Sequence, residues 1–510
     1  MPRRPRIVSQ AALILGGQIF SGIVLFVTTP YIALGLGAER YGLYVLLFLF
    51  LGYSTALDFG LSFALVKHIA EHDPETQRTE IDSLVNTATA VYAAVATAFV
   101  VALVVGRGWI TRDLLHVPDA QAPTVGDAAL LLASSVPFAT AATLFNALFR
   151  GLLRFDYVAL FSLANGSVYS IGAALLVSVG AGLRAVIALY AAVTAASAMI
   201  QWAVLRRLLP GFRPVLRPDA KRLRQLLSFG GFMAFNQVGR IALLQLDRLV
   251  IARVLSLSMA AYYAVPFGIS QRLNMLGAAA ATVAFPHSSA STARGELDDF
   301  RGQYLQTARV VCWLTLAPSL AVIVLADQIL RYWMSPEFAI HGTLPLRLLA
   351  VGILWISVAS LDAVSIEGSG RPWVTSVFMA IAGVANLVGL LVLTPRWGLG
   401  GAAASVTLAF LALASLDVWY YNKRVTHSPL RLWLSSVVLP ATLTSLVSTP
   451  VILVLRQFVT GLPSLIVVTL AATGLAAVIG YRTFLLAEER QWLKARAGKL
   501  WTLSETSQGD

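Results

Sequence analysis

Apolar segments long enough to cross a bilayer recur through this 510-residue chain, and they constrain its fold more than any other feature. A bilayer core needs about 20 consecutive apolar residues in a helix. Lipid cannot satisfy open strand edges, so we expect an all-α, polytopic membrane protein with about fourteen transmembrane helices. The predicted spans are 9–36, 42–66, 83–106, 127–149, 156–180, 184–208, 227–253, 260–285, 304–326, 345–366, 373–395, 398–421, 432–456 and 463–486.

Composition supports this class of protein. Hydrophobic residues make up 57% of the chain and charged residues 12%, against about 25% charged in soluble domains. The net charge is +13, and the distribution of this charge alternates from loop to loop. We therefore expect it to set the membrane topology, and we predict no nucleic-acid partner. The single cysteine, Cys312, lies in an apolar run, so no disulfide holds the fold.

Basic residues predict the orientation. With the N-terminus in the cytoplasm, the inner segments hold roughly 25 Lys and Arg and the outer loops about 9. An even number of spans then returns the C-terminus to the same side. We expect a multi-pass protein of the cytoplasmic (inner) membrane with both termini cytoplasmic.

A basic, proline-marked connection from Arg206 to Arg224 divides the chain into halves of six predicted spans. Gln18 and Tyr44 map onto Gln237 and Tyr263 with one constant offset, which indicates parallel, pseudo-symmetric repeats related by an axis along the membrane normal. The predicted parts are an N-terminal lobe (1–210), a linker (211–226), a C-terminal lobe (227–425), two extra helices (426–487) and a cytoplasmic tail (488–510).

The stretch from Phe229 to Leu255, which forms most of the seventh predicted span, carries polar residues at a depth where lipid cannot solvate them. At 100° per residue, Asn236, Arg240 and Asp247 fall on one stripe of a continuous helix. Arg240 either lines a cavity or forms an internal ion pair. Asp247 either titrates during transport or pairs with an arginine. The sequence predicts that this stripe faces a polar path.

Further candidates lie in other spans. Arg248 either contacts substrate or extends toward the outer interface. Arg272 and Gln271 lie inside span eight, and Gln18 lies in span one. Asp58 in span two either contacts a transported ion or substrate, or accepts a structural hydrogen bond from a facing helix. We therefore predict Arg240, Arg272, Asn236, Arg248, Gln18 and Gln271 as substrate-binding residues, and Asp247 and Asp58 as ion-coupling residues.

Three stretches resemble the polysaccharide (O-antigen type) flippases of the multidrug/oligosaccharidyl-lipid/polysaccharide flippase superfamily. They run from Leu34 to His72, from Leu226 to Val265 and from Glu367 to Ser405. The most specific part is GAERYG followed by Leu57-Asp58-Phe59-Gly60-Leu61.

The resemblance implies a two-lobed, alternating-access carrier. Its substrate would be an undecaprenyl-diphosphate-linked oligosaccharide, which it would move from the inner to the outer leaflet for O-antigen, exopolysaccharide or capsule biosynthesis. Its partners would be membrane lipids and glycan polymerase or export machinery. Arginine suits a diphosphate because its planar fork binds oxygens in pairs. The alternatives are a lipid II flippase for peptidoglycan synthesis, a multidrug/cation antiporter of the same superfamily, and a non-transporting scaffold.

Catalytic motifs are missing from the sequence. It contains no G-x-x-x-x-G-K-[ST] loop for ATP and no H-E-x-x-H or clustered Cys/His site for a metal. We predict a protein that is not an enzyme and needs no cofactor or metal.

Overall fold

The computed structural model describes residues 4–491 apart from 57, 59, 72–76, 110, 112–121, 210–212, 214, 295–296, 370, 484 and 486–489. Some helical stretches, among them 227–235, 276–294 and 297–301, are described without their side chains. Every long element in the described residues is a helix, and none of these residues is a strand. This confirms the predicted all-α class. Most of the predicted tail, 488–510, lies outside the described residues.

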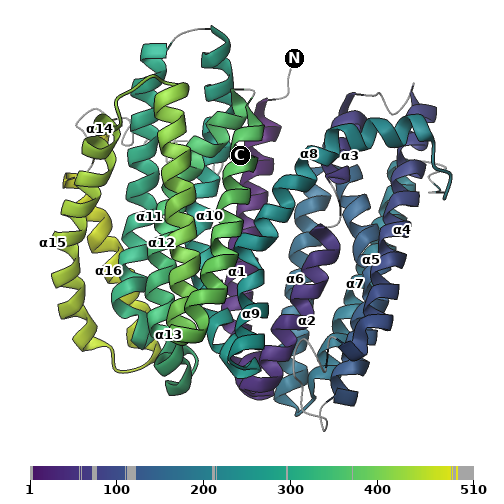
Figure 1. Ribbon diagram of the computed structural model, residues 1–510, viewed down its shortest axis with the longest axis horizontal. Helices are drawn as coiled ribbons and strands as arrows, with labels where there is room; N and C mark the ends of the chain where they lie inside the picture. Colours follow the sequence, from purple (N-terminus) through teal and green to yellow (C-terminus); the bar gives the residue numbers. More distant parts are fainter. Residues whose placement is uncertain are drawn as a thin grey trace, which may run out of the picture. The chain divides into compact units, whose positions relative to one another are not determined.

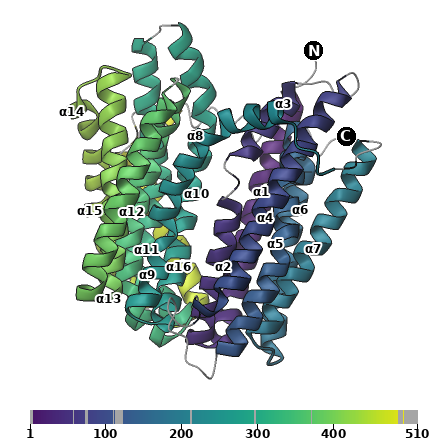
Figure 2. The ribbon, with the colours of Figure 1, turned by 45° about the vertical axis from the view of Figure 1, so that its right-hand side comes forward.

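The first of two compact units spans Met1–Ala264. Its helices are α1 (Arg4–Leu36), α2 (Ala38–Ala56), α3 (Leu61–Glu71), α4 (Arg78–Trp109), α5 (Ala122–Gly151), α6 (Phe155–Ser178), α7 (Leu183–Leu208), α8 (Ala220–Leu244) and α9 (Leu246–Val254). Helix α5 packs along α4 and α7, and α1 packs along α6 (Figure 1). Figure 2 shows α4, α5, α6 and α7 side by side from a second direction. Fully buried Leu65, Leu148 and Phe149 lie in the core between α3 and α5.

The second unit spans Val265–Asp510, and α10 (Leu257–Arg294) begins in the first unit and continues into it. Its other elements are α11 (Leu297–Trp333), α12 (Pro336–Gly368), α13 (Pro372–Arg424), α14 (Leu430–Trp433), the π-helical η2 (Leu434–Val438), α15 (Leu439–Leu455), the 3-10 helix η3 (Arg456–Phe458) and α16 (Leu462–Thr483). Helix α12 packs between α11 and α13, while α15 and α16 lie along α11 (Figure 1). The indole ring of Trp433 and the phenol ring of Tyr421 are buried in this unit's core.

Nine helices in the described part of the chain are long and apolar enough to cross a membrane. One of them, Pro372–Arg424, covers two predicted spans, 373–395 and 398–421. The chain is a multi-pass membrane protein. The count of fourteen spans stays a prediction.

Helix α13 folds back on itself near its middle. Trp397 and Gly398 leave helical geometry, and Gly398 has a φ of +56°, which favours glycine. The Ser405 hydroxyl then donates to the Asn386 carbonyl oxygen at 2.9 Å, across 19 residues of sequence. A Cβ on Gly401 would overlap the Leu393 carbonyl oxygen, so only glycine lets the two halves approach this closely. The turn at Trp397 and Gly398 thus divides α13 into two helical halves, which correspond to the two predicted spans.

Two predicted spans are interrupted, and the expectation of a continuous helix in each was wrong. The span at 42–66 divides into α2 and α3 around Asp58, and the span at 227–253 divides into α8 and α9 at Gln245. At the first place the Asp58 carboxylate accepts from the Ser62 backbone N–H in the first turn of α3. At the second, Asp247 lies in the first turn of α9 and accepts from the Arg248 backbone N–H. Such local bonds compete with helix continuation. Neither interruption requires proline.

The connection that was predicted as a linker is anchored to the first unit. The backbone N–H of Val215 donates to Asn86 at 2.8 Å, and that of Asp219 donates to Thr87 at 3.1 Å. Arg222 forms an ion pair with Glu80 on α4. These contacts explain why α8 belongs to the first unit, whose limit at Ala264 falls later than the predicted linker 211–226. The predicted lobe boundaries remain a prediction.

Candidate functional site

Helix α8 brings Arg240 to the surface of the first unit, on the stripe that the sequence predicts. The side chain is exposed, and its Nε donates to the Gln237 side-chain oxygen at 3.3 Å. Asn236 lies one turn earlier and is half-buried. Gln237 accepts from Nε, and among the described contacts this leaves the two terminal nitrogens of Arg240 for a ligand. A guanidinium offered in this way can receive a pair of phosphate oxygens.

Asp247 does not continue this stripe, because the chain leaves helical geometry at Gln245. Its side chain is 0% exposed, whereas Arg240 is exposed. One carboxylate oxygen accepts from the Arg248 backbone N–H at 2.8 Å. The phenol groups of Tyr53 and Tyr263 and the Arg248 guanidinium lie close enough to interact with it electrostatically. The structure therefore separates two residues that the sequence placed on one face.

The side chain of Gln245, at this interruption, lies against α2. Its side-chain oxygen lies 3.4 Å from the place a Cβ would take on Gly52. The small residue on α2 thus leaves room for the amide. The half-buried Arg248 follows directly, in the first turn of α9.

Asp58 stabilises the start of α3 and its contact with α4. Its carboxylate accepts from the Ser62 hydroxyl at 2.6 Å and from the Ser62 backbone N–H at 3.2 Å, and the Tyr92 hydroxyl on α4 also donates to it. The first bonds cap the N-terminus of α3, where a negative charge is stabilised by the helix dipole. The bond to a facing helix is one of the two roles the sequence left open.

The second unit holds Arg272 and Gln271, both half-buried on α10. The Arg272 Nη1 donates to the Gly268 carbonyl oxygen at 2.8 Å, one turn earlier. Asn274 accepts a 2.9 Å hydrogen bond from Ser357 on α12. Gln18 lies on α1, but its side chain is outside the described residues.

The first unit contains a polar pocket that was not predicted from the sequence. It encloses about 390 Å³ between α3, α5, α6 and α7. Its polar lining consists of Ser62, Thr143, Asn146, Arg150, Ser162, Asn165 and Gln201. The Asn146 amide nitrogen contacts the Gln201 side-chain oxygen at 3.5 Å, and Gln201 donates to Ser197 at 3.1 Å. An exposed arginine, Arg150, stands at its edge.

The pocket offers amide and hydroxyl groups, which both donate and accept hydrogen bonds, next to one permanent positive charge. That combination suits a ligand that carries hydroxyl groups and an anionic group. Its signal in the sequence was the uncharged amides Asn146, Asn165 and Gln201 inside apolar spans, which are costly in lipid unless they are satisfied. The sequence analysis selected other amides (Asn236, Gln18 and Gln271) and missed these, because the pocket joins side chains from four helices.

Metal ligands do not cluster in the part of the chain that the structure describes, where no three His, Cys, Asp or Glu side chains form a group that could hold an ion.

Comparison with known proteins places this geometry in a family context. A family model described as polysaccharide biosynthesis protein matches residues 7–291. A Shigella flexneri protein assigned as an O-antigen transporter is 22% identical over 432 residues, covering 82% of this chain and 98% of that protein. A Haloferax volcanii protein assigned as a low-salt glycan biosynthesis flippase is 22% identical over 410 residues, covering 80% and 82%.

Solved structures share the fold. The lipid II flippase MurJ in an inward closed conformation superposes with a TM-score of 0.73 at 15% identity, covering 92% of this chain and 99% of that one. An inward-facing multidrug resistance MATE family transporter of the MOP superfamily gives a TM-score of 0.66 at 15% identity, covering 82% and 98%. At these identities the likeness concerns the fold alone.

Proposed function

We propose, because this chain belongs to the polysaccharide biosynthesis protein family, that it is a flippase for an undecaprenyl-diphosphate-linked oligosaccharide. It would carry the lipid from the inner to the outer leaflet of the cytoplasmic membrane by alternating access and would catalyse no covalent step. The relatives assigned as an O-antigen transporter and a glycan flippase support this substrate class.

The polar pocket of the first unit is the observation that carries the proposal. A multidrug antiporter needs acidic as well as aromatic groups to hold organic cations. This pocket has Phe63 and Phe161, but its lining presents amides, hydroxyls and Arg150 in place of carboxylates. A glycan headgroup supplies hydroxyls for the amides, and its diphosphate supplies oxygens for arginine. By the predicted orientation the pocket lies at the cytoplasmic end of the unit, where α5 ends and α6 begins, so it would meet the substrate before translocation.

The predicted site residues take roles within this proposal. Arg240, Arg248 and Arg272 would contact the diphosphate, and Asn236, Gln18 and Gln271 the glycan. Asp247 and Asp58 would couple transport to an ion, in addition to the helix ends that both carboxylates hold. Membrane lipids and a glycan polymerase or export machinery are the proposed partners.

Deletion of the gene tests the function. We expect lipid-linked oligosaccharide to accumulate on the cytoplasmic face and surface polysaccharide to be lost, with both restored by the intact gene. Unchanged surface glycan with no stalled intermediate would refute the proposal. Arrested peptidoglycan synthesis would identify a lipid II flippase instead, and altered resistance to cationic dyes on overexpression would identify an antiporter.

A further inference from the structure

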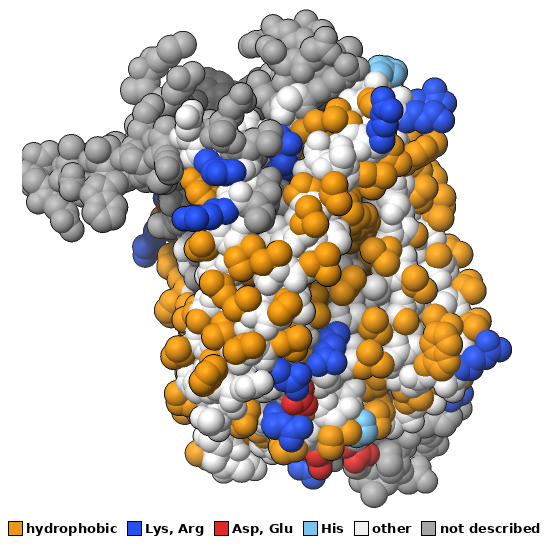
Figure 3. Space-filling view, turned by 90° about the vertical axis from the view of Figure 1, so that its left-hand side faces the viewer, with side chains coloured by type: hydrophobic (Ala, Val, Ile, Leu, Met, Phe, Trp, Pro, Cys, Tyr) orange, Lys and Arg blue, Asp and Glu red, His pale blue; other side chains and the backbone are white. Residues whose placement is uncertain are grey.

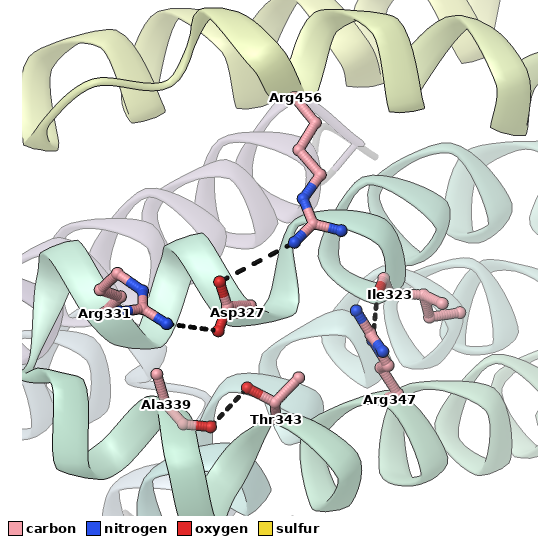
Figure 4. A network of polar contacts seen from close by, with 7 residues as sticks. All are labelled: Ile323, Asp327, Arg331, Ala339, Thr343, Arg347 and Arg456. Carbon is pink, nitrogen blue, oxygen red and sulfur yellow. Dashed lines mark hydrogen bonds and ion pairs between the residues drawn. The ribbon is translucent and has the colours of Figure 1, made fainter.

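Two arginines contact one carboxylate at one end of the second unit, and a third arginine bonds to the backbone of the same helix. Asp327, near the end of α11, accepts from the Arg331 Nη2 at 3.2 Å. Its other oxygen lies 3.8 Å from the Arg456 Nη2, at the turn between α15 and α16. Arg347 on α12 donates its Nε to the Ile323 carbonyl oxygen of the same α11 segment at 3.2 Å. We call Asp327, Arg331, Arg347 and Arg456 the arginine cluster (Figure 4).

The positive charges of the arginine cluster exceed its negative charge, since Arg331 and Arg456 share the Asp327 carboxylate while Arg347 bonds to a backbone carbonyl oxygen. Each guanidinium carries five N–H donors, and in the described part of the chain each of these three uses one nitrogen in a polar contact. The Arg456 side chain is 34% exposed and that of Arg331 is 45% exposed, so their remaining donors reach the surface. These remaining donors can bind a second anion.

Interfacial snorkelling and the helix dipole account for only part of the arginine cluster. Arg331 lies in the last turn of α11, where a positive charge is favoured. Arg347 lies about three turns into α12 and is half-buried, so neither a helix end nor free water explains its position. Its guanidinium instead points to the α11 segment that carries Asp327 (Figure 4).

An apolar wall adjoins the arginine cluster. Helix α15 ends at Leu455, next to Arg456, and exposes Leu446, Val447, Leu453 and Val454 along its length. Figure 3 shows this face of the molecule as largely apolar, with basic side chains toward both ends and acidic side chains toward one of them. A lipid whose phosphate lies at the arginine cluster would thus find apolar surface for its chain. By the predicted orientation this end of the unit lies at the outer leaflet.

We propose that the arginine cluster binds the diphosphate group of a polyprenyl lipid at the outer end of the second unit. This inference rests on the proposed function for the identity of the lipid. Arginine forks hold paired phosphate oxygens, and the excess of positive charge matches an anionic headgroup rather than a neutral one. The site would hold the carrier lipid once it has reached the outer leaflet.

Photo-crosslinking at Phe458 tests the site directly, because this exposed residue lies two positions from Arg456. The full-length protein carries benzoylphenylalanine in place of Phe458 and is irradiated with undecaprenyl diphosphate. We expect crosslinked lipid, displaced by excess inorganic pyrophosphate and retained with equimolar phosphatidylglycerol. The double variant Arg347→Gln/Arg456→Gln should lower the crosslinking yield about tenfold.

Arg184→Gln is the matched control, since Arg184 pairs with Asp127 at 2.7 Å in the first unit and its replacement should leave the yield unchanged. If the double variant does not fold, Arg347→Lys keeps the charge without the fork and should still reduce the yield several-fold. Equal competition by phosphatidylglycerol, or an unchanged yield in the arginine variants, would overturn the site. Neither result bears on the deletion phenotype, so the site and the proposed function fail separately.

Discussion

At the scale of single residues, both predicted ion-coupling aspartates hold the start of a helix. Asp58 bonds to Ser62 at the beginning of α3, and Asp247 bonds to the Arg248 backbone at the beginning of α9. The sequence identified both as unusual because a carboxylate is costly inside a span. It could not show that each interrupts its own helix, since the bond that does so depends on the backbone of the following residues. The two carboxylates could be identified from the sequence, but the groups to which they bond could not.

Asp58 provides the first prediction. Asp58→Ala removes the acceptor for Ser62 and for Tyr92, so the protein should lose about 1–3 kcal/mol of stability and accumulate at a lower level. Asp58→Asn keeps one oxygen acceptor and should be milder. The measurement is membrane protein level together with surface glycan. Normal accumulation with abolished transport would show that the carboxylate acts in transport instead.

Arg240 provides the second prediction. Arg240→Ala should abolish transport while the protein still inserts, because the exposed guanidinium bonds only to Gln237 among the described contacts. Arg240→Lys should restore activity in part, since an ammonium keeps the charge and loses the two-pronged geometry. Surface glycan per unit of membrane protein is the readout. Full activity in Arg240→Ala, or recovery in the Arg240→Ala/Asp247→Ala double variant, would remove Arg240 from the substrate path.

At the scale of elements, apolar length predicted where most helices lie but not where they break. The hairpin within α13 could be anticipated from Pro395 and Gly398, which end one apolar run and begin another. The break at Gln245 has no proline or glycine signal. It coincides with contacts that the sequence does not show, namely the Asp247 bond to the Arg248 backbone and the approach of Gln245 to α2. The pocket between α3, α5, α6 and α7 was hidden for a similar reason, because Asn146 and Gln201 are 55 residues apart in sequence.

The α13 hairpin gives the third prediction. Gly401→Ala should destabilise the protein because the added methyl group would overlap the Leu393 carbonyl oxygen, which belongs to backbone. Gly126→Ala on α5 is the control, since a Cβ there meets nothing within 4 Å and alanine favours a helix by about 0.5–1 kcal/mol. Thermal unfolding of the purified variants in detergent compares the two. Equal midpoints would show that the α13 halves are farther apart than described.

At the scale of the whole molecule, composition and the spacing of apolar segments were enough to predict a multi-pass, all-helical protein. They could not define its compact units, because the predicted linker bonds to α4 through Asn86 and Thr87. Orientation rests on the distribution of arginine and lysine alone.

Cysteine labelling tests the orientation. Cys312, the single native cysteine, is buried and should give little background. With both termini cytoplasmic, Arg184→Cys and Gly461→Cys should react with an impermeant maleimide in intact cells. Lys221→Cys should react only after permeabilisation. The reversed pattern would invert the topology and move the polar pocket to the outer face.

Translocation by the purified protein in proteoliposomes tests the central claim most directly. A fluorescent undecaprenyl-diphosphate-linked oligosaccharide would be placed in one leaflet, and its appearance in the other would be followed with an impermeant quencher. We predict transfer by the intact protein, its loss in Arg240→Ala, and strong reduction when the pocket amides are removed in Asn146→Ala/Gln201→Ala. Transfer no faster than in protein-free vesicles, with correctly folded protein present, would contradict the account.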